Sequence, residues 1–230
     1  MDLEIYAKGA LEIMNDATSI FNVDRGKIVT DGVYDIKGYL NSKRIMWVLK
    51  ESYGTENGYR LFADEYWDKP EENRDKILMH MKQNLTLRRL TQISYALENE
   101  LEVSEARQKV LEPYEYVNTL RTIGYVNTGK KISGSSSTTS YSRLRQLYKE
   151  GGELVLKQLA LYKPHIIVFA GTFNVYNENN RFAPKGEGEN IYELRGCKWG
   201  KPLIVSAYHP AARVNQDKYF ESILSVRNFC

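Results

Sequence analysis

Apolar positions near the start of the chain repeat at spacings of three and four residues. The repeating positions are Leu3, Ala7, Ala10, Leu11, Met14, Ala17 and Phe21. This spacing predicts an amphipathic helix over residues 3–21. Residues 24–42 show no such period, and we expect irregular chain there, interrupted by a short strand around residues 33–36.

Four later apolar runs do not alternate with polar residues, which is typical of strands buried on both faces of a parallel sheet. The runs cover residues 44–50, 123–127, 165–170 and 203–207. Helical character is expected at residues 71–101, 114–120, 141–162 and 217–226. Strands alternating with helices predict an α/β fold: a three-layer α/β/α sandwich with a central, mainly parallel four-stranded sheet.

The domain organisation follows from length and pattern. The chain has 230 residues and no internal repeat, so we expect one domain over residues 1–230, with a helical insertion at about 66–118. No apolar stretch approaches the roughly 20 residues that cross a bilayer, and the acidic N-terminal segment is unlike a signal peptide. We therefore expect a cytoplasmic protein without a membrane partner. Two cysteines and three scattered histidines predict no metal site and no cofactor.

The charge of the chain is unevenly distributed. The formal net charge is +3, yet residues 51–120 hold nine basic and fourteen acidic side chains, whereas residues 121–150 hold six basic and one acidic. A basic segment beside a Ser/Thr-rich loop is suited to a phosphate or a polyanion. The alternative is a solvated face balanced by the acidic segment.

Polar residues follow each of the four apolar runs. Glu51 follows the first, Asn127 ends the second, Gly171 follows the third, and His209 with Pro210 follows the fourth. Ligands of open α/β sheets bind beyond the carboxyl ends of the strands. We therefore expect these residues to border the functional site.

A carboxylate after the first strand, an asparagine at the end of the second and a His-Pro pair after the last resemble the uracil-DNA glycosylase superfamily over roughly residues 44–224. The resemblance implies catalytic roles for Glu51, which would orient or activate water, and for His209, which would stabilise the leaving base. It implies that Asn127 reads the base edge. Aromatic side chains would stack on the extruded base, and Tyr53 and Phe62 are candidates.

The resemblance implies a DNA glycosylase-like hydrolase that binds DNA or another nucleic acid and acts on uracil or a damaged base in DNA repair by base excision. Lys130 and Lys131, in the basic segment, and Arg213, just past the His-Pro pair, are candidates for contacts with backbone phosphates. The cysteine count excludes the iron–sulfur branch of the family.

Three departures from the family pattern keep other functions open. Lys50 stands where the family usually has Gly, Tyr53 where it has Pro, and Ala211 where it has Ser. A catalytically inactive module that binds a nucleobase or nucleic acid is the main alternative, and a hydrolase of free nucleosides is another. The segment from Gly124 to Lys130 also fits the P-loop spacing, but Lys131 replaces the Ser or Thr that would hold magnesium. Glu51 and Asn127 also have structural interpretations, as an ion-pair partner and a turn residue.

Overall fold

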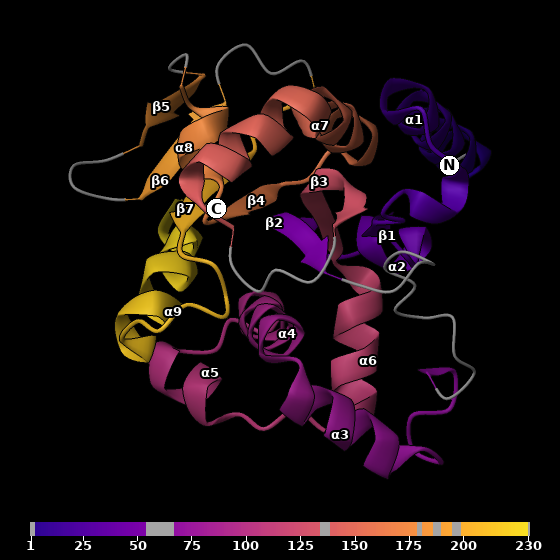
Figure 1. Cartoon of the computed structure of the whole chain (residues 1–230). Helices are drawn as coiled ribbons and strands as arrows, with labels where there is room; N and C mark the ends of the chain where they lie inside the picture. Colours follow the sequence, from indigo (N-terminus) through magenta and orange to yellow (C-terminus); the bar gives the residue numbers. More distant parts are fainter. Residues whose placement is uncertain are drawn as a thin grey trace.

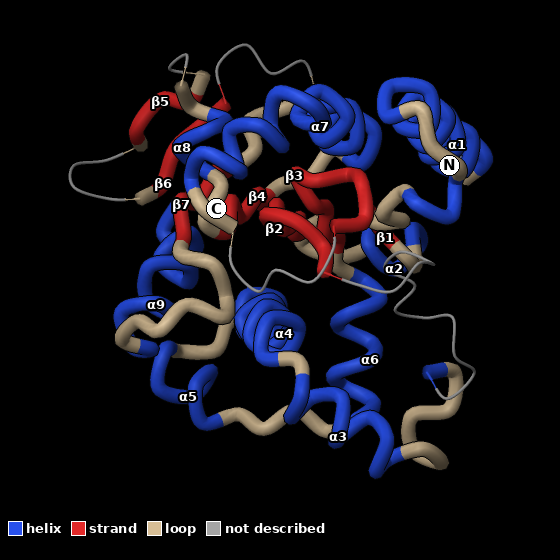
Figure 2. Tube along the Cα trace, in the orientation of Figure 1, coloured by secondary structure: helices blue, strands red, loops and turns tan. Residues whose placement is uncertain are grey.

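The computed structural model describes residues 3–53, 67–133, 139–178, 181–185, 190–194 and 199–229. In these ranges a mixed sheet lies between two layers of helices (Figures 1 and 2). The described part of the chain is therefore an α/β structure, as the alternating pattern predicts. Among these residues, no helix combines the length and apolar character needed to cross a membrane.

The sheet has seven strands in the order β1-β3-β2-β4-β7-β6-β5. The four central strands are mutually parallel, whereas β1 is antiparallel at one edge and β6 and β5 are antiparallel at the other. The strands are β1 (Gly32–Val33), β2 (Ile45–Tyr53), β3 (Gly124–Ser133), β4 (Ile166–Ala170), β5 (Phe182–Pro184), β6 (Ile191–Leu194) and β7 (Leu203–Ala207).

Helices cover both faces of the sheet. One layer contains α1 (Glu4–Phe21), α2 (Ile36–Leu40), α7 (Tyr141–Tyr162) and α8 (Phe173–Tyr176). The other contains α3 (Arg74–Gln83), α4 (Leu85–Glu98), α5 (Val103–Gln108), α6 (Pro113–Thr122) and α9 (Gln216–Leu224). Short 3-10 turns at Arg25–Lys27 and Ser225–Phe229 complete the described elements. Figure 1 shows α7 above the sheet, with α4 and α6 below it.

The burial of both faces of strand β2 explains why apolar and polar residues do not alternate in its sequence. Ile45 and Trp47 belong to the apolar core beneath α4 and α6, while Met46 and Val48 belong to the core beneath α7 and α8. All four side chains are fully buried. A strand with helices on both faces needs apolar side chains at successive positions, which is the pattern that the sequence carries.

The prediction of four strands is wrong, because the sheet has seven. The three additional strands are two to four residues long and lie at the edges. The short strand expected around residues 33–36 overlaps β1, whereas β5 and β6 carry too few positions for a recognisable pattern. The helix expected over residues 71–101 is two helices. Asn84 separates them and caps α4, its side-chain oxygen accepting a hydrogen bond from the Leu87 amide at 3.0 Å.

Strand β3 is longer than the apolar run predicts, because polar side chains in it are paired inside the protein. Lys130 Nζ donates hydrogen bonds to both carboxylate oxygens of Asp31, at 2.8 and 3.0 Å, and to Gln158 Oε1 at 2.5 Å. The exposed fractions of the two charged side chains are 3% for Lys130 and 1% for Asp31. Burial lowers the pKa of Lys130, and Asp31 opposes this shift. The ion pair is thus a buried link between the segment before β1 and strand β3.

We expect Lys130→Met to lower the free energy of unfolding by about 3–5 kcal/mol, because Asp31 would keep a buried charge without its partner. Lys157→Met breaks an exposed pair with Asp16 and serves as the matched control, with an expected change below about 1 kcal/mol. Urea unfolding measures both. Equal, small losses in the two variants would contradict the assignment of the Lys130 pair as a structural link.

Candidate functional site at the carboxyl ends of the central strands

The chain order of the parallel strands places a topological switch point between β2 and β4. From β2 the chain continues to β3 on one side, and after β4 it continues to β5, β6 and β7 on the other side. Ligands of open α/β sheets bind at such a switch point, outside the carboxyl ends of the strands. The residues at these ends are therefore the first candidates for a functional site.

Lys50 and His209 converge on Gly171 at this edge of the sheet. Gly171 has a positive φ of 73°, and a Cβ atom there would lie 3.0 Å from Lys50 Cε and 3.3 Å from the backbone nitrogen of His209. Its amide donates a hydrogen bond to Ala207 O at 2.6 Å. Glycine is required both by the backbone conformation and by the close approach of its neighbours. The ends of β2, β4 and β7 thus meet at one point.

The hydrogen bonding of His209 identifies its tautomer. The backbone amide of Ala211 donates to His209 Nδ1 at 3.2 Å, so Nδ1 is an acceptor and the neutral ring carries its hydrogen on Nε2. Burial, together with the positive charge of Lys50, lowers the pKa of His209 to about 4. His209 is therefore neutral at pH 7 and offers Nε2–H as a hydrogen-bond donor.

Arg89 of α4 holds the loop that carries His209. Its Nη1 donates hydrogen bonds to Pro210 O at 2.5 Å and to Ala212 O at 3.1 Å. The contact joins residues 121 positions apart in the chain. Nothing in the local sequence distinguishes Arg89 from a solvated arginine on an amphipathic helix, so its role cannot be predicted from the sequence.

Glu51 lies at the same edge of the sheet but has different neighbours. Thr139 Oγ1 donates a hydrogen bond to its carboxylate at 2.8 Å, and Arg143 Nε lies 3.9 Å from it. A Cβ atom on Gly129 would lie 2.9 Å from Glu51 Cβ, so the carboxylate is beside β3 and the start of α7. Its side chain is 4% exposed. The neighbour of His209 is instead Lys50, which stands out in the sequence only as a departure from the glycosylase family pattern.

Asn127 and Lys130 lie away from this convergence, in the polar cluster around Asp31. The Asn127 amide donates to Asp31 Oδ2 at 2.6 Å, and its side-chain nitrogen is 3.3 Å from the same oxygen. Asn127 is 4% exposed. Strand β3 continues beyond Asn127 to Ser133, which leaves Asn127 inside the strand rather than at its end. Lys130 is enclosed with Asp31 and does not present its charge to a phosphate outside the protein.

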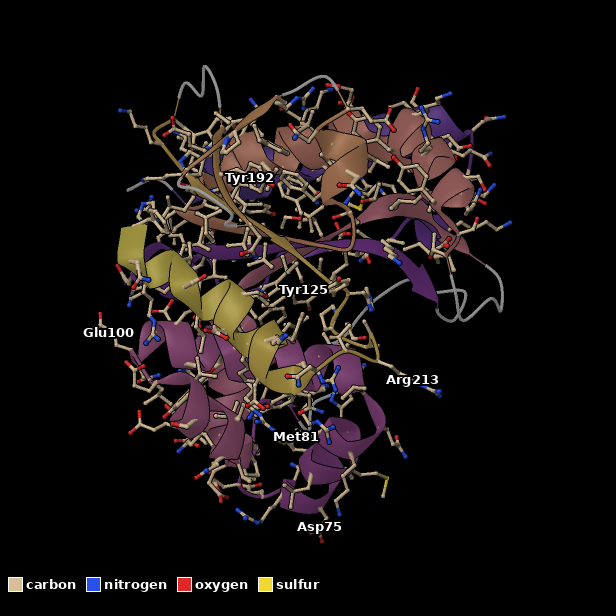
Figure 3. The ribbon with its side chains drawn as sticks, turned by 90° about the vertical axis from the view of Figure 1, so that its left-hand side faces the viewer. Asp75, Met81, Glu100, Tyr125, Tyr192 and Arg213 are labelled. Carbon is tan, nitrogen blue, oxygen red and sulfur yellow. The ribbon has the colours of Figure 1, made fainter. Side chains whose placement is uncertain are left out.

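Of the remaining candidate site residues, two are exposed and two lie partly or wholly outside the described residues. Lys131 and Arg213 are exposed, and Figure 3 shows the Arg213 side chain projecting away from the ribbon. The side chain of Tyr53 and the whole of Phe62 lie outside the described residues.

A cavity of about 420 Å³ opens beside the convergence of Lys50 and His209, between α7, α8 and the end of β7. This volume is within the range typical of small-ligand pockets. Asn190 donates to the carbonyls of Ser206 and Ser222 at 2.9 and 2.8 Å, which holds this wall of the cavity in place. The lining residues are Tyr141, Leu144, Gly171, Phe173, Asn174, Asn190, Ser206, Ala207, Tyr208 and Ser222.

The chain matches no protein-family model and no curated protein. Within the described ranges, no group of three or more His, Cys, Asp and Glu side chains is placed to hold a metal ion.

We expect Lys50→Met to raise the pKa of His209 above about 4, because the variant removes a neighbouring positive charge that disfavours protonation. The rise is partial, since burial is the larger cause of the shift. An NMR titration of the His209 ring protons measures it, with the His80 and His165 resonances as internal references. Lys8→Met, which changes an exposed lysine of α1, is the control. An unchanged pKa of His209 in Lys50→Met would contradict the proximity of the two side chains.

Proposed function

We propose that this protein is a divergent member of the uracil-DNA glycosylase superfamily that binds nucleic acid and hydrolyses the N-glycosidic bond of uracil or a damaged base. The observation that carries the proposal is the neutral His209, with its Nε2–H free of the Ala211 hydrogen bond, beside the Lys50 cation at the switch point of the sheet. A neutral donor next to a positive charge is suited to an oxygen on which negative charge develops.

The proposed reaction replaces one bond to the sugar with another. The oxygen of a water molecule bonds to C1′, the bond between C1′ and the base nitrogen breaks, and its electron pair leaves with the base. His209 Nε2–H and the Lys50 ammonium would stabilise the resulting anion, and Glu51 would accept a proton from the water. The base anion then takes up a proton from solvent. Thr139, by donating to Glu51, would hold the carboxylate in one orientation.

Nucleic-acid binding in this proposal depends on exposed cations near the same edge. Arg213 lies four residues after His209, in the loop that Arg89 anchors, and Lys131 is exposed on β3. Both are free to approach backbone phosphates, which confer affinity without sequence preference. The buried Lys130 has no such role.

A binding module without hydrolytic activity is the second candidate, and the position of Lys50 favours it. Its Cε atom lies beside Gly171 and His209, where the resembling enzymes usually have only a glycine backbone next to the ligand. A lysine there would reduce the space for a flipped base and would pair with an anion instead. The two candidates differ in whether bound nucleic acid loses a base.

We expect Glu51→Gln and His209→Ala each to lower the rate of base release by at least about 100-fold, because each removes a group acting on the transition state. The assay uses single- and double-stranded oligonucleotides that carry uracil, hypoxanthine or an oxidised pyrimidine. Glu150→Gln and His165→Ala change exposed residues of the same types and serve as matched controls with the parent rate.

Binding and base-release assays of the unsubstituted protein distinguish the candidate functions. Binding of the oligonucleotides in a salt-dependent manner, with no base released, would overturn the hydrolase and support the binding module. Release from a free nucleoside, without affinity for oligonucleotides, would identify a nucleoside hydrolase instead.

A further inference from the structure

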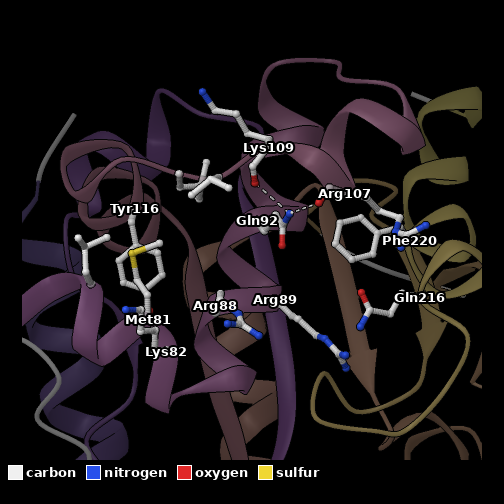
Figure 4. Close-up of a pocket in the computed structure, with 13 residues that line it drawn as sticks. Met81, Lys82, Arg88, Arg89, Gln92, Arg107, Lys109, Tyr116, Gln216 and Phe220 are labelled. Carbon is white, nitrogen blue, oxygen red and sulfur yellow. Dashed lines mark hydrogen bonds between the residues drawn. The ribbon is translucent and has the colours of Figure 1, made fainter.

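A second cavity, of about 340 Å³, lies within the helical layer formed by α3 to α6 and α9 (Figure 4). It shares none of its lining residues with the cavity beside His209. Its walls combine basic and apolar side chains. The lining residues are Leu78, Met81, Lys82, Arg88, Arg89, Gln92, Arg107, Lys109, Val110, Leu111, Tyr116, Gln216 and Phe220.

The lining of this cavity carries an excess of positive charge. Five lining residues are basic and none is acidic. Arg107 pairs with Asp217 and Lys109 pairs with Glu115, but both acids lie outside the lining. Arg89 donates to backbone carbonyls, which neutralise no charge. Lys82 and Arg88 are exposed and have no ion-pair or hydrogen-bond partner among the described residues. Three positive charges thus remain without a counter-charge, which matches the charge of a phosphate or diphosphate group.

The cavity also presents a hydrogen-bond acceptor whose orientation is fixed. Gln92 Nε2 donates to the carbonyls of Ala106, Arg107 and Lys109, at 2.7, 3.2 and 3.1 Å. Figure 4 shows the amide nitrogen turned toward the carbonyls of Arg107 and Lys109 and the amide oxygen turned the other way. An oxygen that can only accept requires a ligand with an N–H or O–H donor. Inorganic phosphate or diphosphate provides such a donor only through a protonated oxygen, so it cannot bring its full negative charge and a donor at once.

Apart from Gln216, the rest of the lining is largely apolar, with Met81, Tyr116 and Phe220 among its residues. Such side chains bury the uncharged body of a ligand rather than its phosphate. A ligand that satisfies all three features carries two or three negative charges, a hydroxyl or amino donor, and a flat or apolar body. Nucleotides have this combination.

We propose that the cavity between α3 to α6 and α9 binds a nucleotide, with its phosphates at Lys82, Arg88 and Arg89 and its nucleoside part against Gln92 and the apolar wall. The nucleotide is either free or the end of a nucleic-acid strand, since both present the same chemistry. The proposal does not depend on hydrolysis at His209.

Isothermal titration calorimetry with ADP tests the proposal. We expect ADP to bind, and pyrophosphate and adenosine each to bind at least about tenfold more weakly, because each satisfies only part of the lining. The double variant Lys82→Gln/Arg88→Gln should weaken ADP binding by about tenfold or more, since it removes two charge-assisted contacts. Lys8→Gln/Lys149→Gln removes the same charge from exposed lysines of the other layer and should change the affinity less than about twofold.

Val110→Glu provides a second variant that leaves the core intact, because Val110 lines the cavity and is 74% exposed. The added negative charge should weaken ADP binding to a similar degree. Unfolding midpoints of all variants establish that they are folded. Pyrophosphate binding as tight as ADP binding, or equal loss in the Lys8/Lys149 control, would overturn the proposal.

A 5′-phosphorylated single-stranded oligonucleotide distinguishes the two sources. If ADP binds, the oligonucleotide does not, and Lys82→Gln/Arg88→Gln weakens ADP binding, the ligand is a free nucleotide. If the oligonucleotide binds, with or without ADP binding, and the same double variant weakens its binding, the site accepts a strand end. Binding of neither overturns the proposal. His209→Ala should leave ADP affinity unchanged while abolishing base release, so failure of the hydrolase and failure of this site give different results.

Discussion

Strand β2 is buried on both faces of the sheet, and the positions of the neighbouring strands and helices follow from this burial. Successive side chains from Ile45 to Val48 are fully buried, in two cores on opposite faces of the sheet. Each such side chain contributes about 1.5–3 kcal/mol when removed from water. Because β2 also pairs with β3 on one side and β4 on the other, its register determines where Lys50 and Glu51 emerge. The candidate site is therefore carried by a strand whose displacement would expose apolar side chains on both of its faces.

The ion pair of Asp31 and Lys130 extends this arrangement toward the edge of the sheet. A buried pair is weak evidence for stability, because desolvation offsets much of the attraction, but an unpaired partner would be costly. Asp31 also accepts hydrogen bonds from Asn127 and Gln158, so β3, α7 and the segment before β1 share one carboxylate. The cluster selects one packing of these elements over others that would leave a charge unpaired.

Arg89 connects the helical layer to the site at the carboxyl ends of the strands. It belongs to α4, lines the basic cavity, and donates hydrogen bonds to carbonyls on either side of Ala211, whose amide in turn holds His209 Nδ1. The helices between β2 and β3 thus do more than cover the sheet. They anchor the loop that presents His209 and also form a cavity with an excess of positive charge.

The α/β class, the four central strands and most of the long helices can be predicted from the sequence, because unbroken apolar runs and amphipathic periodicity are local properties of the chain. The sequence also predicts a functional site at the end of β2 and at His209, and the structure places both at the carboxyl edge of the sheet. It indicated a short strand near β1 but did not reveal the edge strands β5 and β6, which are too short to carry a pattern, or the extension of β3, whose polar residues find partners such as Asp31 and Gln158 only in the folded chain. The proximity of Lys50 to His209 and the anchoring of the His209 loop by Arg89 depend on the tertiary structure, because these contacts join residues more than 100 positions apart.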